Sequence, residues 1–504
     1  MSAPAPVEDI ASAAGEPVAD RRLHPMSWLF VLVQNLKHYI LPLLAVIFIG
    51  GGDRNELWSL ISVGLLVLFS LWQYFTYRYG VGGNGLVVRS GLLNRSLRVI
   101  PFVRIQNVAV HQTVLHRLFG VAEVRMESAG GKEPEAQMRV LKLADALALE
   151  TLVRRRGADP AQAAEDRAES LLRLTPADVL RLGLVSNGGL VLAGAGLATV
   201  MQYGPDVSRR LTERTLRGGA HWLFGRVEGY HFDTTGYALL AVAGILAVAA
   251  ALKGLSVALA LLRYYGFELS EQGRRLTAER GLLARWRTTV PRRRIQAWTL
   301  EEGVLHRLLR RRRLAVDTVG ADEHEEGRAL KELAPIATPA VCDGLIAHLL
   351  PHARWDALHW RPLPKAVWWR LFLPDLPWTL LAAFVGYWHL GEWSLLALLW
   401  LPWAAFKAQR RARRMGYAMD AELVAVREGW WHRHWRFAEF DKLQALQITR
   451  SPLDRRCGTA TLWLDTAGAG ALAAPLRIRF LPVDDARALY ERLAASLAKR
   501  PLRW

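Results

Sequence analysis

The densest charged stretch of the sequence lies between Arg274 and Arg313, and its residue type is suited to binding anions. It holds thirteen arginines against the three carboxylates of Glu279, Glu301 and Glu302. Guanidinium groups grip phosphate and carboxylate oxygens through a planar fork of N–H donors. Eight of them are our candidates for lipid or partner binding: Arg285, Arg287, Arg292, Arg293, Arg310, Arg311, Arg312 and Arg313. A solvated basic face that binds nothing is the alternative reading.

Two charged residues interrupt stretches that are otherwise apolar. Lys253 lies within 237–262, and Asp375 lies within 371–390. Charges in such surroundings are often functional, because removing them from water costs free energy. The two side chains could therefore pair or line a path through the protein. Contacts with nearby carbonyl groups or water would explain them equally well, and the sequence does not decide between these readings.

No motif of a familiar catalytic or cofactor site is present in the sequence. It lacks the Gly-Lys-Ser/Thr phosphate loop, the Gly-x-Ser-x-Gly elbow, His-Glu-x-x-His and Cys-x-x-Cys. Its two cysteines, Cys342 and Cys457, lie far apart and are expected to be reduced thiols. We therefore expect a non-catalytic protein without a metal or cofactor. Nucleic acid is not an expected partner, because no aromatic stacking platform accompanies the arginines.

The arginine-rich stretch is one copy of a forty-residue pattern that occurs three times without gaps. The copies span 91–130, 281–320 and 429–468. Self-similarity of this kind indicates a repeated structural unit. Each copy has a basic residue followed two positions later by glutamine: Arg104 and Gln106, Arg294 and Gln296, Lys442 and Gln444. This signature could contact a partner, but its recurrence favours a role in the fold, such as satisfying backbone groups at a strand edge.

The local patterns predict what each copy folds into. Polar and apolar residues alternate in 121–128 and again in 461–466, which predicts strands. Amphipathic helices are predicted to close the three units over 144–155, 340–350 and 484–497. Several strands followed by one helix predict a small sheet or open barrel plugged by a helix.

Composition and hydropathy indicate a membrane protein. The chain of 504 residues is 52% hydrophobic, has 20 tryptophans and carries a formal net charge of +19. Apolar stretches come in pairs before each unit, which predicts three transmembrane hairpins and six helices in all. These stretches are 29–52, 57–77, 182–203, 237–262, 371–390 and 393–406.

Charge predicts the orientation of these hairpins. The presumed outer loops 53–56, 204–236 and 391–392 hold six basic and seven acidic residues, whereas the rest of the chain is strongly basic. The positive-inside rule then places both termini in the cytoplasm. The division expected is a disordered tail at 1–21, hairpins at 22–78, 174–262 and 351–407, modules at 79–156, 263–350 and 408–504, and a linker at 157–173.

The repeat resembles a known family. The sequence Pro-x-x-Arg-Ile-Gln at 101–106 and 291–296, then Leu-His-Arg and a strand closing in Ala-Gly, is similar to the bacterial pleckstrin-homology-like (PH-like) domain. Three such modules interleaved with apolar hairpins resemble the YdbT-type bacterial membrane proteins over roughly residues 22–500. The resemblance implies a bent sheet capped by a C-terminal helix in each module, and a location in the bacterial inner membrane.

The copies depart from this pattern at two places, and the resemblance specifies no ligand. The third copy reads Phe-Asp-Lys-Leu-Gln at 440–444, and the second has Arg310 where the others have Gly120 and Gly458. We expect a scaffold that presents three cytoplasmic modules at the membrane, with anionic lipid head groups and a protein partner or further copies of itself as ligands. The alternative is a transporter or export component gated by the modules. Uniformly apolar helices favour the scaffold, because transport paths need polar lining.

Overall fold

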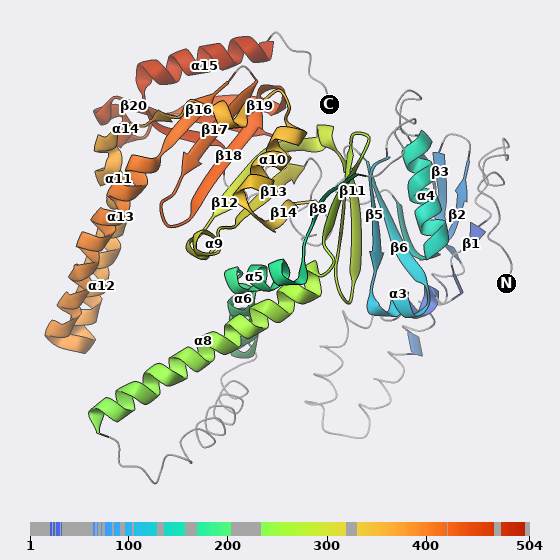
Figure 1. Ribbon diagram of the computed structural model, residues 1–504, viewed down its shortest axis with the longest axis horizontal. Coiled ribbons are helices and arrows are strands. Elements are labelled where there is room, and N and C mark those ends of the chain that lie inside the picture. The colour runs from blue at the N-terminus through green and yellow to red at the C-terminus, as the bar shows by residue number, and fades with distance from the viewer. Residues whose placement is uncertain are drawn as a thin grey trace.

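The structure is a computed structural model that describes residues 77–82, 85–90, 96–102, 105–128, 136–156, 169–202, 233–318, 330–420, 422–467 and 475–498. Before residue 77 it describes only short pieces within 21–32 and isolated positions within 64–76. The predicted tail, most of the first hairpin and most of the linker lie outside the described residues. Three sheet-containing modules lie side by side in chain order, and α8 and α12 extend away from them (Figure 1).

The first module has two sheets and a closing helix. Apolar side chains alternate along its strands, and those that point inwards form one buried core. This core includes Leu86 and Met126 from the two sheets, and Leu149 and Val153 from the helix. Its elements are β1 (Arg21–Arg22), β2 (Arg78–Val81), β3 (Gly85–Ser90), β4 (Ser96–Pro101), β5 (Ile105–Gln112), α3 (Val114–Leu118), β6 (Val121–Ser128), β7 (Ala136–Lys142) and α4 (Leu143–Arg156).

The second module repeats this order after an insertion of three helices. The insertion comprises α5 (Pro176–Val185), α6 (Gly188–Gln202) and α8 (Thr234–Tyr264). The module itself comprises β8 (Glu169–Arg173), β9 (Glu268–Gln272), β10 (Arg275–Arg280), β11 (Arg285–Pro291), η4 (Arg292–Arg294), β12 (Ile295–Glu302), α9 (Val304–Leu308), β13 (Arg312–Thr318), β14 (Glu332–Ala337) and α10 (Pro339–Leu349).

The third module follows the same plan, which confirms the internal repeat. Its insertion contains η6 (Lys365–Val367), α11 (Trp368–Phe372), α12 (Asp375–Leu390), η7 (Gly391–Leu399) and α13 (Trp400–Arg414). The module comprises η5 (Trp355–Ala357), β15 (Arg361–Pro362), β16 (Gly416–Met419), β17 (Leu423–Glu428), β18 (Arg433–Glu439), η8 (Phe440–Lys442), β19 (Leu443–Thr449), α14 (Pro452–Cys457), β20 (Thr459–Thr466), β21 (Arg477–Pro482) and α15 (Val483–Ala498).

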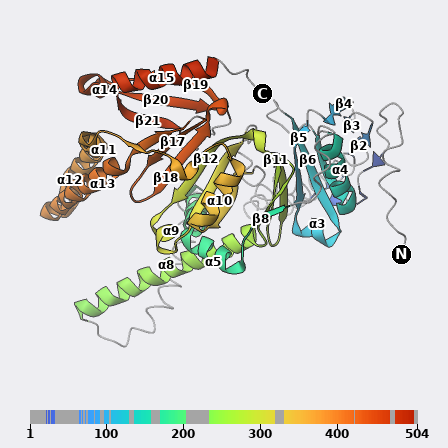
Figure 2. The same cartoon turned by 45° about the horizontal axis from the view of Figure 1, so that its top comes forward.

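Neighbouring modules share their sheets. β5 of the first module pairs with β11 of the second, which gives one sheet of order β7-β6-β5-β11-β10-β9-β8. β12 of the second pairs with β18 of the third and gives β14-β13-β12-β18-β17-β16-β15. The hydrophobic core is continuous across the second junction, where Phe437 of β18 packs into the same cluster as Trp298 and Leu300. The modules are therefore joined by backbone hydrogen bonds between strands. Figure 2 shows β11 beside β5 and β18 beside β12.

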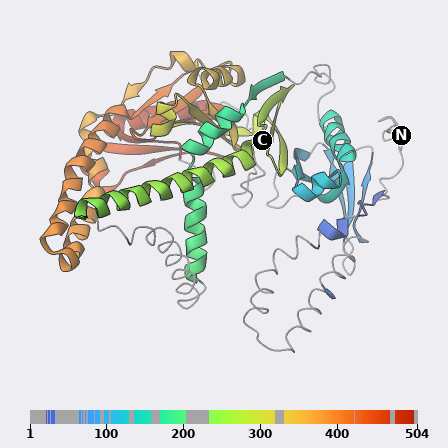
Figure 3. The same cartoon turned by 60° about the horizontal axis from the view of Figure 1, so that its bottom comes forward.

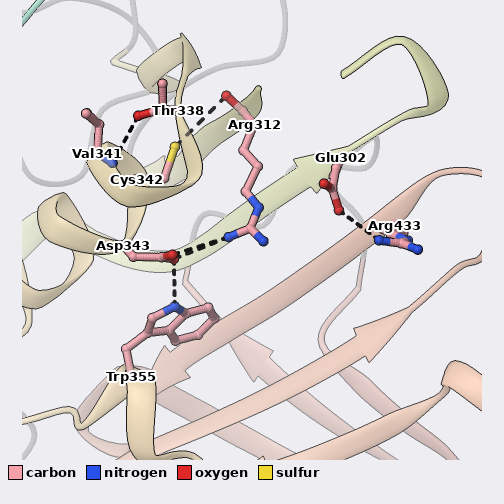
Figure 4. Close-up of polar contacts among 8 residues, drawn as sticks. All are labelled: Glu302, Arg312, Thr338, Val341, Cys342, Asp343, Trp355 and Arg433. Atoms are coloured by element: carbon pink, nitrogen blue, oxygen red, sulfur yellow. Dashed lines mark hydrogen bonds and ion pairs between the residues drawn. The ribbon is translucent and has the colours of Figure 1, made fainter. Parts of the chain in front are cut away.

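Polar side chains reinforce the second junction (Figure 4). The Arg433 guanidinium donates to the Glu302 carboxylate at 3.3 Å, from β18 to the end of β12. Nearby, the Asp343 carboxylate accepts from Arg312 at 3.4 Å and from the indole N–H of Trp355 at 3.1 Å. Because Trp355 begins the segment that leads to the third module, this contact fixes how that segment leaves α10.

The prediction of six membrane-spanning helices in three hairpins is wrong for the described residues. One helix there is long and apolar enough to cross a bilayer: Thr235–Tyr264, with mean hydropathy 2.3. Pro176–Val185 and Gly188–Thr199 add a second span only if this pair, bent by 51°, counts as one. Helix α12 has 16 residues and runs into a 3-10 helix, so it is shorter than the roughly 20 residues that a span needs.

Because the described residues lack these six helices, the predicted multi-pass topology is not supported. The outer loop 53–56 and most of 204–236 lie outside the described residues. The third loop, 391–392, begins η7, in which Ser394 is buried. Helices still project from the sheets: the apolar helices α6 and α8 leave the second module, and the apolar helix α12 and the amphipathic helix α13 leave the third (Figure 3).

Candidate functional site

The candidate site is a basic pocket in the third module, with a volume of about 430 Å³. Four arginines and one aspartate line it, and they come from α11, α14, β21 and the end of β19. Guanidinium groups therefore outnumber the carboxylate by four to one, which suits an anionic ligand. The lining residues are Arg370, Thr449, Arg450, Ser451, Asp454, Thr461, Trp463, Arg477, Arg479 and Phe480.

Local structure fixes the position of Asp454 in the lining of this pocket. Ser451 caps α14 by accepting from the backbone N–H of Asp454, and the Asp454 carboxylate accepts in return from the Ser451 N–H at 2.9 Å. This reciprocal pairing is a capping box, which fixes the first turn of a helix. In the first two modules His116 and His306 occupy the same position and contact the N-cap backbone. The third module thus has an acid where the others have imidazole.

Asp454 in turn fixes one of the arginines. Its carboxylate accepts from the Arg370 guanidinium at 2.8 Å and from the Thr459 hydroxyl at 2.7 Å. The Arg370 and Asp454 side chains are each 7% exposed. Burial alone would raise the pKa of Asp454, but hydrogen bonds from Ser451, Thr459 and Arg370 hold that pKa well below its usual range. The pair is therefore ionised at neutral pH.

The remaining arginines have no such acid partner within the pocket. Arg477 and Arg479 stand two residues apart on β21, so they project from the same face of the strand. Arg477 lies over the Trp463 ring at 4.9 Å, and Arg479 lies over the Phe480 ring at 4.7 Å. Burial lowers the pKa of Arg479, Glu428 partly offsets this, and Arg477 lowers it further. A bound anion would relieve this crowding of like charges.

Phe480 lines the pocket and has a strained backbone conformation. It has φ of 62°, in the left-handed region that residues other than glycine rarely adopt. Its ring lies between Arg370, at 4.5 Å, and Arg479. Strained residues of this kind cluster at functional sites, where the surrounding structure holds them in place.

The structure scatters the eight arginines that the sequence singles out in the second module. Five of them form ion pairs within the protein. Arg287 pairs with Glu150 of the first module at 3.3 Å, and Arg292 pairs with Glu271 at 2.9 Å. The other three arginines pair as follows: Arg311 with Asp178, Arg312 with Asp343, and Arg313 with both Glu301 and Glu332. Most of this charge therefore connects elements of the fold.

Three of the eight remain available to a ligand. Arg285, Arg293 and Arg310 are exposed and form no ion pair with another described residue. They lie on β11, on η4 and after α9, so they do not make one compact site. Binding of an anionic lipid by this surface stays a prediction, and the structure narrows it to these side chains.

The repeat signature has contacts within the fold. Gln296 is buried, and its amide donates to the Arg294 carbonyl at 3.3 Å, while the Arg294 side chain is itself buried. The Lys442 ammonium reaches across the second junction to the Arg293 carbonyl at 3.2 Å. Gln444 is exposed. Arg104 and the side chain of Gln106 lie outside the described parts of the chain.

The two charges in apolar stretches have separate partners. The Lys253 ammonium donates to the carbonyls of Leu184 and Ser186 at 3.0 and 3.1 Å, and to the Asn187 amide oxygen at 3.2 Å. It thereby satisfies backbone acceptors at the end of α5, where the chain bends into α6. Asp375 pairs instead with Lys407 of α13 at 3.0 Å. The structure does not bring Lys253 and Asp375 together.

Sequence reasoning missed the pocket because its residues come from distant segments. Arg370 precedes Arg477 by more than a hundred positions, and nothing in the spacing links them. One signal was available: Arg-Ile-Arg at 477–479 places two basic side chains on one face of a predicted strand. The corresponding strands of the other modules, β7 and β14, carry no such pair.

Comparison with known proteins agrees with this architecture. The model of the family described as "Bacterial PH domain" matches residues 31–157, 224–338 and 371–497, which together cover well over half of the chain. The chain belongs to that family, and it is a YdbT-type protein with three PH-like domains. It is 22% identical over 409 residues to the "UPF0699 transmembrane protein YdbT" of Bacillus subtilis (strain 168), covering 76% of this chain and 79% of that protein. No solved structure matches the chain.

Proposed function

We propose that this protein is a non-catalytic membrane-associated scaffold whose third PH-like module binds the phosphate of an anionic lipid head group. The observation that carries this proposal is the pocket of four arginines around a single aspartate. The aspartate is already engaged by Arg370, so Arg450, Arg477 and Arg479 supply uncompensated positive charge. A lipid phosphate offers the acceptor oxygens that such guanidinium groups bind.

The place of the pocket in the chain supports a lipid source for that phosphate. Arg370 lies on α11 beside Trp368 and Trp369, which are partly exposed. Aromatic side chains of this kind favour the head-group layer of a membrane. Helix α12 follows, and its Trp378 is 72% exposed. A membrane that covers these apolar side chains would bring its head groups to the level of the pocket.

Membrane association itself rests on two supports. Helix α8 is apolar apart from Lys253 and Arg263, and 11% of its most apolar segment is buried inside the protein. The relative from Bacillus subtilis is named a transmembrane protein. We infer that α8 anchors the chain in the bacterial membrane and that the three modules, joined through shared sheets, form a rigid platform at its surface.

A lipid titration tests the proposed site. The full chain in neutral detergent is titrated with short-chain phosphatidic acid, and in parallel with inorganic phosphate, while its melting temperature is followed. A ligand that binds the folded state raises this temperature. We expect a rise with phosphatidic acid that weakens as salt increases from about 0.05 M to about 0.5 M. Inorganic phosphate giving the same rise would assign the pocket to free phosphate.

Matched variants locate the effect. Replacing Arg477 and Arg479 by glutamate should weaken binding about tenfold or more, because each basic residue contributes about 1 kcal/mol of attraction to an anionic surface. Arg456→Glu reverses one charge at an exposed position of α14, outside the pocket lining, and should have little effect. If Arg456→Glu lost about half as much binding free energy as the double variant, only net charge would matter and the pocket would not be a site.

A further inference from the structure

The two junctions between modules use equivalent strands, paired in the same register. At the first, β5 pairs with β11 so that His111 lies opposite Trp286. At the second, β12 pairs with β18 so that Glu301 lies opposite His434. Equivalent positions lie 190 residues apart in the first and second copies of the repeat, and 148 residues apart in the second and third. Glu301 is therefore the counterpart of His111, and His434 is the counterpart of Trp286. One antiparallel register therefore joins every pair of neighbouring modules.

This arrangement leaves two complementary edge strands, one in the first module and one in the third. β4 of the first module corresponds to β11 and β18, and β19 of the third module corresponds to β5 and β12. β4 is the last strand of its sheet, and β19 is the last strand of the sheet β19-β20-β21, within the described residues. The first and third modules lie on opposite sides of the second (Figure 2). The chain is thus a segment of a repeating arrangement with unlike ends.

Two apolar side chains that are exposed on β4 occupy positions whose counterparts are packed into the core at the second junction. Leu97 and Val99 of β4 are 64% and 55% exposed. Their counterpart positions in β18 are Trp435, which packs against the core, and Phe437, which is fully buried. Unpaired strand edges with apolar side chains promote pairing with another chain unless they are covered.

β19 offers the matching apolar face. Its Leu446 and Ile448 are half-buried against the core of the third module. Their counterparts in β12, Trp298 and Leu300, are buried opposite Phe437 and Trp435 at the second junction. Apolar cross-strand pairs of this kind stabilise antiparallel sheets.

We propose that copies of this protein associate end to end, with β19 of one copy pairing with β4 of the next in the register of the internal junctions. That register places Ile448 opposite Leu97 and Leu446 opposite Val99. A second copy is the occupant because one chain carries both halves of the interface. An interface between unlike surfaces propagates into a ring or a filament.

Cysteine cross-linking in the full chain tests the register. Cys457 is exposed and is replaced by serine, while buried Cys342 is kept. Leu97→Cys and Ile448→Cys are then introduced together, and bacterial membranes containing the protein are oxidised mildly. Cα atoms in antiparallel pairs lie about 4.5–5.5 Å apart, which suits a disulfide. We expect a ladder of dimers and larger species on a non-reducing gel.

A one-residue shift provides the control. Leu97→Cys combined with Gln447→Cys places the two thiols on opposite faces of the sheet, so the ladder should be lost. Equal ladders from both pairs, no ladder from either, or a disulfide within a single chain would each overturn the proposal. In a second test, Leu97 and Val99, both exposed, are changed to lysine. This variant should be monomeric in mild detergent where the wild type is assembled, and an unchanged size distribution would contradict the proposal.

The assembly and the lipid site can fail separately. The lysine variant alters β4 of the first module, far along the chain from the pocket of the third. Its melting temperature should therefore respond to phosphatidic acid as the wild type does. Loss of assembly in this variant, with no response to phosphatidic acid in either protein, would support the end-to-end interface alone. Unchanged assembly, with a response to phosphatidic acid in both proteins, would leave only the pocket.

Discussion

At the scale of single residues, the departures between repeat copies have structural reasons. Gly120 and Gly458 end their short helices with φ of 62° and 64°, in the left-handed region. The second copy has Arg310 at this place, and it adopts the same conformation with φ of 51°. In this region a residue with a Cβ atom is destabilised by about 1–2 kcal/mol, whereas glycine is not. The second module therefore carries local strain that the others avoid.

Arg310→Gly should relieve this strain. Because glycine also has more conformational freedom in the unfolded chain, the net gain should be up to about 1 kcal/mol in the free energy of unfolding. Thermal unfolding of the full chain measures it as a rise in melting temperature. Arg310→Ala removes the guanidinium but keeps Cβ, so it should bring no such rise. A larger gain with alanine than with glycine would point to charge repulsion instead of strain.

Asp454 gives the third module a pH dependence. Its pKa is lower in the folded protein than in the unfolded chain. The stability it contributes is therefore present above the unfolded value of about 4 and is lost as the pH falls towards the folded value. Asp454→Asn should cost about 3 kcal/mol at neutral pH, because it leaves Arg370 buried without its counter-charge. The difference in melting temperature between variant and wild type should shrink below about pH 4. A difference that stays constant down to pH 3 would show that the charge is not what matters.

At the scale of elements, the bend between α5 and α6 explains why a charged residue, Lys253, lies in an otherwise apolar stretch. Gly183 and Gly189 pack directly against α8, where a Cβ would meet Val257 at 2.4 Å and the Leu252 carbonyl at 2.1 Å. This close approach brings Lys253 to the open carbonyls at the end of α5. The lysine thus serves as a cap supplied by a neighbouring helix.

Lys253→Met should loosen this bend. It leaves the carbonyls of Leu184 and Ser186 without their donor, at a cost of about 1–3 kcal/mol. Faster hydrogen exchange of the amides between 183 and 189 in the full chain measures the effect. Lys253→Arg retains donors at the same place and should stay closer to wild type. Unchanged exchange in the methionine variant would mean that water satisfies these carbonyls equally well.

How far the sequence predicted these elements depends on the kind of signal. The repeat and its strands were predictable, because alternation and three copies in register reinforce one another. Hydropathy overestimated the spanning helices, since it registers apolar composition but not the break at Ser186 and Asn187 or the 3-10 segment Gly391–Leu399. The pocket was not predictable, because Arg370, Asp454 and Arg479 meet only through tertiary packing.

At the scale of the whole molecule, the shared sheets mean that the second module depends on both neighbours. Its β11 pairs with the first module and its β12 pairs with the third. Its strand β8 also lies outside the predicted module boundaries of 263–350. A segment cut at residues 263 and 350 would therefore lose β8 and the neighbouring strands at both junctions.

The excised segment 263–350 should aggregate or remain unfolded. Cutting it out exposes two strand edges and the apolar side chains Trp298 and Leu300 at one of them, which favours association. Size-exclusion chromatography and thermal unfolding of the segment measure this. A longer segment that begins at residue 78 and ends at residue 498 keeps both junctions and should behave better. A monomeric segment 263–350 with cooperative unfolding would show that the junctions are not needed for folding.

Native mass spectrometry of the full chain most directly tests the central claim that the pocket of the third module binds an anionic lipid. The protein is released from mild detergent after equilibration with equal amounts of phosphatidic acid and phosphatidylcholine, and the lipids that remain bound are counted. The account predicts phosphatidic acid on the wild type and on Arg456→Glu, and its loss when Arg477 and Arg479 are both changed to glutamate. Retention of phosphatidic acid by that double variant, or no preference over phosphatidylcholine in the wild type, would contradict it.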